Sequence, residues 1–473
     1  LFFILWISSF SLFSQSEGKY DINSSDLPKW VTLMYTDNVD PNKVIKEYEL
    51  FYRENKFIKN KHTQYFKRWL RNFSRETIQP KTTKSQSSNN WECIGPWDFD
   101  IDAQSRSYAP GAAHLYTIEQ SLSNSNVLYA GSATAGAWKS NNKGDNWVHI
   151  TKDLHLSGVY AIEIDFQDEN IIYISGNGGV YKSTDSGLNW NNIGGNNFNS
   201  QSHSVKDIKM HPQNNQILFV ASNKGIYKSI DGGQNLNEIM SGDFQEIEFH
   251  PLSSDTMYFI KQETNYTEFY RSNDNGNTLN LFTNGWPSPS SNDEQKRTEI
   301  AVSIASPNKI VALATGAANG GSGLYGIYIS YDKGENWTFR CCGPQPAGVP
   351  SANNINMMGW QPSGLDDGGQ YYYDLALAVN PFNADIIHVG GVNHWISFDD
   401  GYTFSCPAKW SEPHKKGYVH ADIHDINYFG NDLWFACDGG IFYSDNYGDS
   451  IYKKMYGIEG TDFWGFGAGF KDG

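Results

Sequence analysis

An eight-residue phrase returns seven times along this chain and constrains its fold more than any other feature. Two copies read Ser-Thr-Asp-Ser-Gly-Leu-Asn-Trp from Ser183 and Ser-Tyr-Asp-Lys-Gly-Glu-Asn-Trp from Ser330. Repetition at intervals of about 20–50 residues is typical of solenoids, propellers and arrays. The copies start at Ser140, Ser183, Ser229, Ser272, Ser330, Ser397 and Ser444, with spacings of 43, 46, 43, 58, 67 and 47 residues.

The phrase has the chemistry of a tight turn. Its third residue is Asp or Asn, whose side chain accepts hydrogen bonds from backbone N–H groups, and its fifth is Gly, which adopts a positive φ at little cost. Short apolar segments such as 179–182 precede most copies, so each copy is predicted to join two antiparallel strands. The third residues, predicted to be structural, are Asn142, Asp185, Asp231, Asp274, Asp332, Asp399 and Asn446.

The phrase resembles the Asp-box, or bacterial neuraminidase repeat, of sialidase-like and sortilin-like β-propellers. The resemblance implies an all-β fold with at least seven four-stranded blades. It also implies that each Asp-box joins the third and fourth strands of its blade, on the face away from any active site. The propeller is expected to span residues 91–473, with a strand near Trp91 completing the last blade and a further blade cut off at Gly473.

The segment before the propeller has a different character. Residues 1–16 are an apolar run followed by small polar residues, which is typical of the remnant of a secretory signal peptide. Residues 27–78 are predicted to form a helical leader, with one helix starting at Asp40-Pro41 and a second between residues 63 and 73. Residues 79–90 are predicted to be a linker.

The net charge and the cysteine content restrict the classes of partner, cofactor and location that fit this chain. The formal net charge is -16, which argues against nucleic acid or an anionic membrane as the main partner. No later run is long and apolar enough to be a membrane span, and the predicted location is secreted or cell-surface. The Cys spacing is not that of a metal site, and no cofactor is predicted. The cysteines are interpreted as structural or free, and a disulfide between Cys341 or Cys342 and Cys406 is one pairing that the sequence allows.

The two longest spacings predict insertions at residues 286–297 and 341–370. Both are expected on the face opposite the Asp-boxes, where long loops on a rigid scaffold commonly bind ligands. Their aromatic residues, which include Trp286 and Trp360, can stack on sugars, grip a peptide or pack within their own loops.

Two predicted inner strands begin with polar residues. One starts at Tyr373-Asp374, and in the other His420, Asp422 and His424 alternate and are therefore predicted to share one face. Three interpretations stay open for them: a divalent metal site, an acid/base cluster, or structural hydrogen bonding. The candidate ligand-binding residues, expected at one end of the central channel, are Asp374, His420, Asp422, His424, Asp425, Trp286, Trp360 and Tyr373.

Three stretches, at 129–138, 373–374 and 420–425, resemble secreted sortilin-like repeat proteins of Bacteroidetes-type bacteria, which often leave the cell by type IX secretion. The resemblance implies a non-catalytic propeller that recognises extracellular protein or polysaccharide. One alternative is a glycoside hydrolase like the xyloglucan-cleaving endoglucanases, but the stretch 133–136 lacks their first-blade catalytic Asp. The other is a sortilin-type peptide receptor.

Overall fold

A computed structural model describes residues 27–36, 40–56, 62–63, 66 and 111–460, the last range with gaps at 155, 157, 177–178, 195–197, 199–202 and 291. The chain divides into two compact units, residues 1–92 and 93–473. The predicted signal-peptide remnant, the linker, most of the second leader helix, the segment at Trp91 and residues 461–473 lie outside the described residues. None of the described helices is long and apolar enough to cross a bilayer.

The first unit contains two helices, α1 (Lys29–Met34) and α2 (Pro41–Glu54). Helix α2 begins where the Asp40-Pro41 pair predicts, and the Asp40 carboxylate accepts a hydrogen bond from the Asn42 N–H at 3.0 Å. The two helices bury a small aromatic cluster, in which the Tyr48 ring stacks on Phe66 at 4.1 Å.

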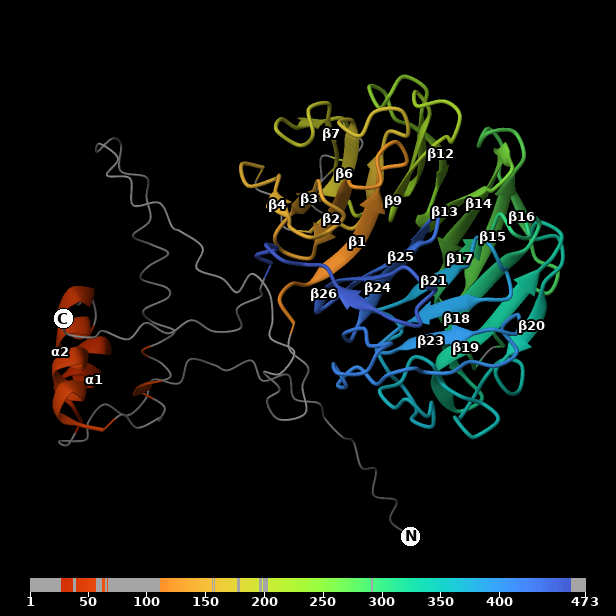
Figure 1. Ribbon diagram of the computed structural model, residues 1–473. Coiled ribbons are helices and arrows are strands. Elements are labelled where there is room, and N and C mark those ends of the chain that lie inside the picture. Colours follow the sequence, from red (N-terminus) through yellow and green to blue (C-terminus); the bar gives the residue numbers. More distant parts are fainter. Residues whose placement is uncertain are drawn as a thin grey trace, which may run out of the picture. The chain divides into compact units, whose positions relative to one another are not determined.

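The second unit is a ring of seven antiparallel blades (Figure 1). Six blades have four named strands, and the sixth blade has three plus a bridge between Ile396 and Ser405 at the position of the fourth. The predicted all-β propeller with seven four-stranded blades is therefore confirmed.

Each blade takes its strands in order from one continuous stretch of chain. The strands of the first four blades are β1 (Leu115–Gln120), β2 (Leu128–Ser132), β3 (Ala137–Ser140), β4 (Val148–His149); β5 (Ile162–Ile164), β6 (Ile172–Gly176), β7 (Gly179–Ser183), β8 (Asn191–Asn192); β9 (Val205–Met210), β10 (Leu218–Ser222), β11 (Gly225–Ser229), β12 (Asn237–Ser241); β13 (Asp243–His250), β14 (Ser253–Gln262), β15 (Thr267–Ser272) and β16 (Asn280–Phe282). The strands of the last three are β17 (Glu294–Val302), β18 (Ile310–Ala318), β19 (Gly321–Ser330), β20 (Thr338–Cys341); β21 (Ala376–Val379), β22 (Ile387–Gly390), β23 (His394–Ser397); β24 (Ile423–Phe429), β25 (Asp432–Cys437), β26 (Gly440–Ser444) and β27 (Tyr452–Lys453).

The hydrophobic core lies between neighbouring blades. Strands in the middle of a blade, such as β2 and β10, are buried at every residue because a blade packs on each of their faces. One cluster joins the first and last blades, where Trp138 packs in the same core as Trp434 and Phe435. Burial of such aromatic side chains contributes about 1.5–3 kcal/mol each to folding.

Among the described residues, the ring closes without an exchanged strand. The last blade draws all four of its strands from residues 423–453, and it lies beside the first blade, blue against orange in Figure 1. The Ala112 N–H donates to the Gly439 carbonyl at 3.1 Å, and Trp147 Nε1 donates to the Lys454 carbonyl at 2.7 Å. The contribution expected from a strand near Trp91 is therefore not needed for a complete last blade.

The repeated phrase forms the same turn in all seven blades, called here the repeat turn. In the copy at Ser330, the serine hydroxyl donates to Asp332 Oδ1 at 2.8 Å and accepts from the Gly334 N–H at 2.8 Å. Asp332 Oδ1 also accepts from the Asn336 N–H at 2.9 Å. The repeat-turn glycines have φ between 71 and 89°, which glycine adopts at the lowest cost. These bonds satisfy backbone groups between the third and fourth strands, as the sequence predicts.

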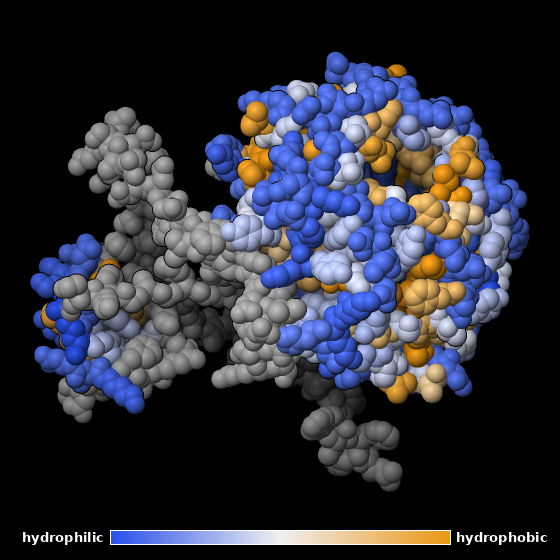
Figure 2. Space-filling view, in the orientation of Figure 1, coloured by the Kyte–Doolittle hydropathy of each residue, from blue (hydrophilic) through white to orange (hydrophobic). Residues whose placement is uncertain are grey.

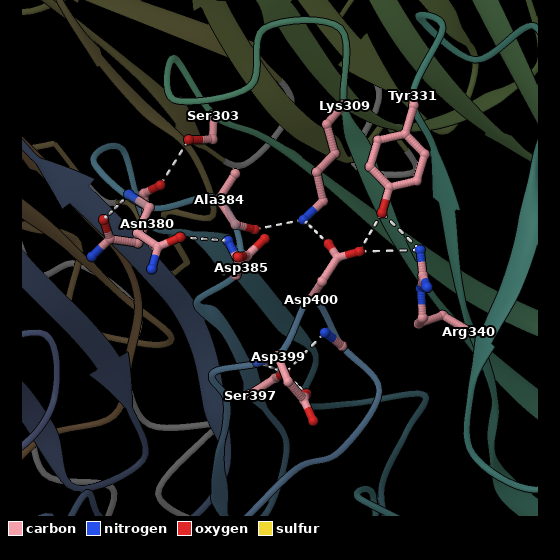
Figure 3. Close-up of polar contacts among 12 residues, drawn as sticks. Ser303, Lys309, Tyr331, Arg340, Asn380, Ala384, Asp385, Ser397, Asp399 and Asp400 are labelled. Atoms are coloured by element: carbon pink, nitrogen blue, oxygen red, sulfur yellow. Dashed lines mark hydrogen bonds and ion pairs between the residues drawn. The ribbon is translucent and has the colours of Figure 1, made fainter.

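A partly buried ion network ties two repeat turns together between the fifth and sixth blades (Figure 3). Lys309 is 3% exposed, pairs with Asp400 and donates to the Ala384 carbonyl at 2.5 Å. Asp400 also contacts the Tyr331 hydroxyl and pairs with Arg340 at 3.1 Å. Asp400 and Tyr331 are the variable residues of their repeat turns, so these positions carry contacts between blades.

Two expectations from the sequence are corrected here. The disulfide to Cys406 that the sequence allows is not formed, because Cys341 and Cys342 pair with each other, while Cys406 is a free thiol that donates to the Ala408 carbonyl at 3.1 Å. The first long spacing is only partly a loop insertion, because β17, β18 and β19 are themselves 9, 9 and 10 residues long. The second spacing does contain a long connection, from β20 to β21.

Candidate functional site

The candidate site lies where the inner strands begin, on the face opposite the repeat turns. Each repeat turn follows the third strand of a blade, so antiparallel order places the start of the first strand at the other end of the blade. The β25–β26 turn and the β20–β21 connection reach this same face. We call the opening of the central channel on this face the channel mouth.

Four side chains from three blades meet at the channel mouth. Asp438 Oδ1 lies 2.9 Å from His114 Nε2 and 2.8 Å from His424 Nε2. The Tyr373 hydroxyl lies 2.8 Å from the same His114 nitrogen and 3.3 Å from both Asp438 oxygens. Burial alone would raise the pKa of Asp438, but its hydrogen bonds with the two histidines lower it below the usual range. Burial lowers the pKa of His424.

Local backbone geometry positions Asp438 for these contacts. It lies in the tight β25–β26 turn, followed by Gly439, whose carbonyl accepts the Ala112 N–H of the first blade. A Cβ on Gly439 would lie 2.2 Å from Cγ of His420, so no other residue fits without displacing that ring. The glycine thus brings the first and last blades together beside the cluster.

Two more carboxyl groups lie next to this cluster. Asp422 accepts a hydrogen bond from Gln370 Nε2 at 3.0 Å and is within hydrogen-bonding reach of Asp438; burial, and then that neighbour, raise its pKa to about 6. Asp374 is 1% exposed, and its oxygens have no well-formed hydrogen bond among the described residues beyond a contact with its own backbone amide. Burial, and then the charge on Asp422, raise the pKa of Asp374 to about 9.

Below the mouth, the channel encloses a cavity of about 360 Å³. Tyrosines wall its upper part, where the Tyr116 and Tyr160 rings stack at 4.6 Å. Six carboxylates and three basic residues line the remainder. The carboxylates are Glu119, Asp207, Glu246, Glu248, Glu299 and Asp425, and the basic residues are Lys206, Lys209 and Arg297.

Several of these carboxylates connect neighbouring inner strands. Asp425 Oδ2 accepts from the Ile118 N–H at 3.0 Å, Asp207 Oδ2 from the Ile247 N–H at 3.0 Å, and Glu246 Oε2 from the Ile300 N–H at 2.8 Å. Burial raises the pKa of Asp425 to about 6 and, together with the charge on Asp207, that of Glu248 to about 7, although Lys209 opposes the second shift. The channel wall therefore combines a structural role with an unusually high density of buried negative charge.

The structure brings together Tyr373, Asp374, Asp422 and His424 of the predicted residues. The predicted alternation of His420, Asp422 and His424 is wrong, because β24 begins only at Ile423 and Asp422 has a φ of 61°. This left-handed residue turns the chain before the strand starts, so the His420 ring packs against Gly439 instead of joining its two neighbours.

The two predicted tryptophans lie apart from the cluster. Trp286 is 7% exposed, packs against Trp337 at 4.7 Å and donates from Nε1 to the Thr267 carbonyl at 2.8 Å, so it fills the space between two blades. Trp360 is 43% exposed in the β20–β21 connection, where its backbone N–H donates to Asp366 at 2.7 Å. Of the two, only Trp360 presents its ring to solvent.

His114, Asp438 and most of the channel carboxylates were not among the residues that the sequence singled out for binding. A signal for the carboxylates was present: inner strands carry charged residues at alternate positions, as in Asp207 and Lys209 or Glu246 and Glu248. Buried strands are normally apolar, so this alternation marks a polar channel. No comparable pattern marks His114, which is a single polar residue directly before β1.

Comparison with known proteins supports the fold alone. No family model and no curated protein matches the chain. Among solved structures, the GH74 xyloglucanase from Xanthomonas campestris matches with a TM-score of 0.51 and 16% identity, over 74% of this chain and 55% of that one. The extracellular domain of BT4673 from B. thetaiotaomicron, assigned to a one component system, matches with a TM-score of 0.50 and 12% identity, over 73% and 40%.

These structures are longer than the present chain, which spans about half of the length of the GH74 enzymes. An ancestral GH74 enzyme gives a TM-score of 0.51 at 14% identity, over 71% of this chain and 45% of that one. Propellers similar to this one thus occur in a xyloglucanase and in the extracellular domain of a one component system.

Proposed function

We propose that this protein is an extracellular, non-catalytic propeller that recognises a partner protein at the channel mouth, by taking a basic segment of that partner into the acidic channel. The observation that carries the proposal is the cavity of about 360 Å³ with tyrosines above and twice as many carboxylates as basic residues below. Tyrosine supplies apolar contact area together with a polar hydroxyl, and is common where proteins bind peptides.

Electrostatics favour a cationic ligand over a neutral glycan. Buried carboxylates that repel one another have raised pKa values, as Glu248 has, because ionisation is costly there. A lysine or arginine side chain in the cavity would lower that cost and allow the carboxylates to ionise. The net charge of -16 would also accelerate the approach of a basic partner.

The geometry of the three carboxyl groups at the channel mouth argues against a hydrolytic site there, which is the alternative that the xyloglucanase likeness raises. Glycosidases separate their two carboxyl groups by about 5–9.5 Å. Asp422 and Asp438 are within hydrogen-bonding reach of each other, which is too close, and Asp374 is only 1% exposed and does not line the cavity. We therefore expect binding without turnover.

The test is a peptide array and a glycan array probed with the protein, beside a hydrolysis screen on β-glucans. We expect binding to basic peptides that weakens about tenfold or more with Tyr372→Ala and falls steeply with salt. Tyr372 is 70% exposed at the mouth, and Tyr452→Ala, at 54% exposure on the outer strand β27, is the matched control. Glycan binding that Tyr372→Ala removes would replace the peptide ligand by a polysaccharide, and turnover of any β-glucan would overturn the non-catalytic assignment.

A further inference from the structure

The strongest unassigned feature is the pair of imidazoles that converge on one carboxylate at the channel mouth. One donor atom each from His114, His424 and Asp438 lies within 4.8 Å of the others. Two nitrogens and one oxygen form the donor set of many catalytic zinc sites and of non-haem iron sites. Sites of this kind leave coordination positions open for water or a ligand.

We propose that His114 Nε2, His424 Nε2 and Asp438 bind one divalent cation of the zinc class, across the junction of the first and last blades. The inference goes beyond the proposed function, because cation binding can be measured with no partner present.

The spacing of the donor atoms suits such an ion after a small adjustment. The two nitrogens lie 2.9 and 2.8 Å from Asp438 Oδ1. A zinc ion with ligands about 2.0–2.1 Å away holds neighbouring ligand atoms about 2.9–3.4 Å apart. The two nitrogen–oxygen distances are close to that range, and the two nitrogens lie within 4.8 Å of each other, so side-chain adjustment would admit the ion.

The site is accessible from one side and supported from the others. The side chains of His114, His424 and Asp438 are 16%, 5% and 27% exposed, so a hydrated ion can reach the carboxylate. The two imidazoles stack at 5.4 Å, and the His424 ring also meets Tyr116 and Tyr373, which limits its rotation. Rigid ligand rings reduce the entropy lost when the ion binds.

The donor set also selects among cations. Imidazole nitrogen suits zinc, copper, nickel and iron, whereas calcium and magnesium prefer all-oxygen sites. The remaining positions would face the cavity that His424 lines, where an oxygen donor from a ligand or water could complete the shell.

The test is calorimetric titration of the tag-free protein with zinc chloride, with calcium chloride as the comparison. We expect one zinc ion per chain, a rise in melting temperature on binding, and at least tenfold weaker binding in His114→Ala and in His424→Ala. His414→Ala is the control, because His414 is an exposed histidine outside the cluster. Circular dichroism before each titration shows whether a variant is folded.

A second measurement needs no variant. X-ray absorption of the zinc-loaded wild type should show only nitrogen and oxygen neighbours at about 2.0–2.1 Å, including two imidazoles. Absence of saturable zinc binding, a sulfur neighbour from a free thiol such as Cys406, or loss of binding in His414→Ala alone would each overturn the proposal.

Discussion

The serine hydroxyl of each repeat turn has several partners, whereas at the channel mouth the Asp374 carboxyl has no well-formed hydrogen bond to another described residue. On the repeat-turn face a single hydrogen-bonding pattern recurs in seven copies. At the channel mouth, by contrast, the blades contribute different side chains. The comparison shows that the residues at the two ends of the same strands have different roles. The repeat turns stabilise the ring, and the irregular ends are free to vary in chemistry.

The largest expected effect comes from the ion network of the repeat-turn face. Lys309→Met removes a cation that is 3% exposed and leaves the Ala384 carbonyl without its partner, so it should lower the free energy of unfolding by about 3–5 kcal/mol. Urea denaturation measures this. The control is Lys416→Met, which breaks an ion pair between side chains 66% and 69% exposed and should cost less than about 1 kcal/mol. Equal losses in both variants would contradict the assignment.

A smaller loss is expected within one repeat turn. Ser330→Ala leaves the Gly334 N–H without its acceptor in a buried turn and should cost about 1–3 kcal/mol. Asp332→Ala should cost less, because the Asp332 side chain is only partly buried and water can replace part of its hydrogen bonding. Zinc and peptide binding by the folded variants should be unchanged. A variant with wild-type melting that had lost ligand binding would break the distinction between the two faces.

The channel should make stability depend on pH. Glu163 is on the inner strand β5 and lies close to Glu119 on β1 and to Asp207 and Lys209 on β9. Burial raises the pKa of Glu163 to about 8. Between its unfolded value, about 4.3, and about 8, the folded state holds the proton more tightly. The free energy of unfolding therefore falls as pH rises through this window, by on the order of 1 kcal/mol or more, and the loss is complete above pH 8.

Glu163→Gln keeps the size of the side chain and removes its titration. Melting temperatures measured from pH 5 to 8 should fall less steeply in this variant than in the wild type. Parallel curves for the two proteins would show that the carboxyl titrates normally and that the channel is better solvated than the structure implies.

The smallest effect on stability is expected at the exposed insertion. Trp360→Ala should change the free energy of unfolding by no more than about 0.5 kcal/mol, because the ring is 43% exposed. A peptide or glycan array shows whether the same variant loses binding. If it binds as the wild type does while Tyr372→Ala does not, the recognition surface is limited to the channel mouth.

Local sequence patterns predicted the fold well. The site was predicted less well, because it depends on contacts between residues that are far apart in the sequence. The repeat turn is a property of eight consecutive residues, so its hydrogen bonds and its glycine conformation follow from the sequence. The cluster at the mouth depends on how the first blade meets the last, which brings His114 to Asp438 from opposite ends of the described ring. The expected alternation at His420 failed for a local reason, since nothing in the residues announced the left-handed conformation of Asp422.

Because every blade is built from one continuous stretch, the described chain passes directly from one blade to the next at six junctions, but not at the junction of the first and last blades. At the other six junctions the chain itself keeps neighbouring blades at a high effective concentration, so a separated pair returns quickly. Within the described residues, the closing junction is held by non-covalent contacts alone, and an opening there would part His114 from Asp438 and His424. A ligand that binds the first and last blades at once would shift this equilibrium toward the closed ring by mass action. Its measured binding free energy would therefore include the free energy of closing the junction.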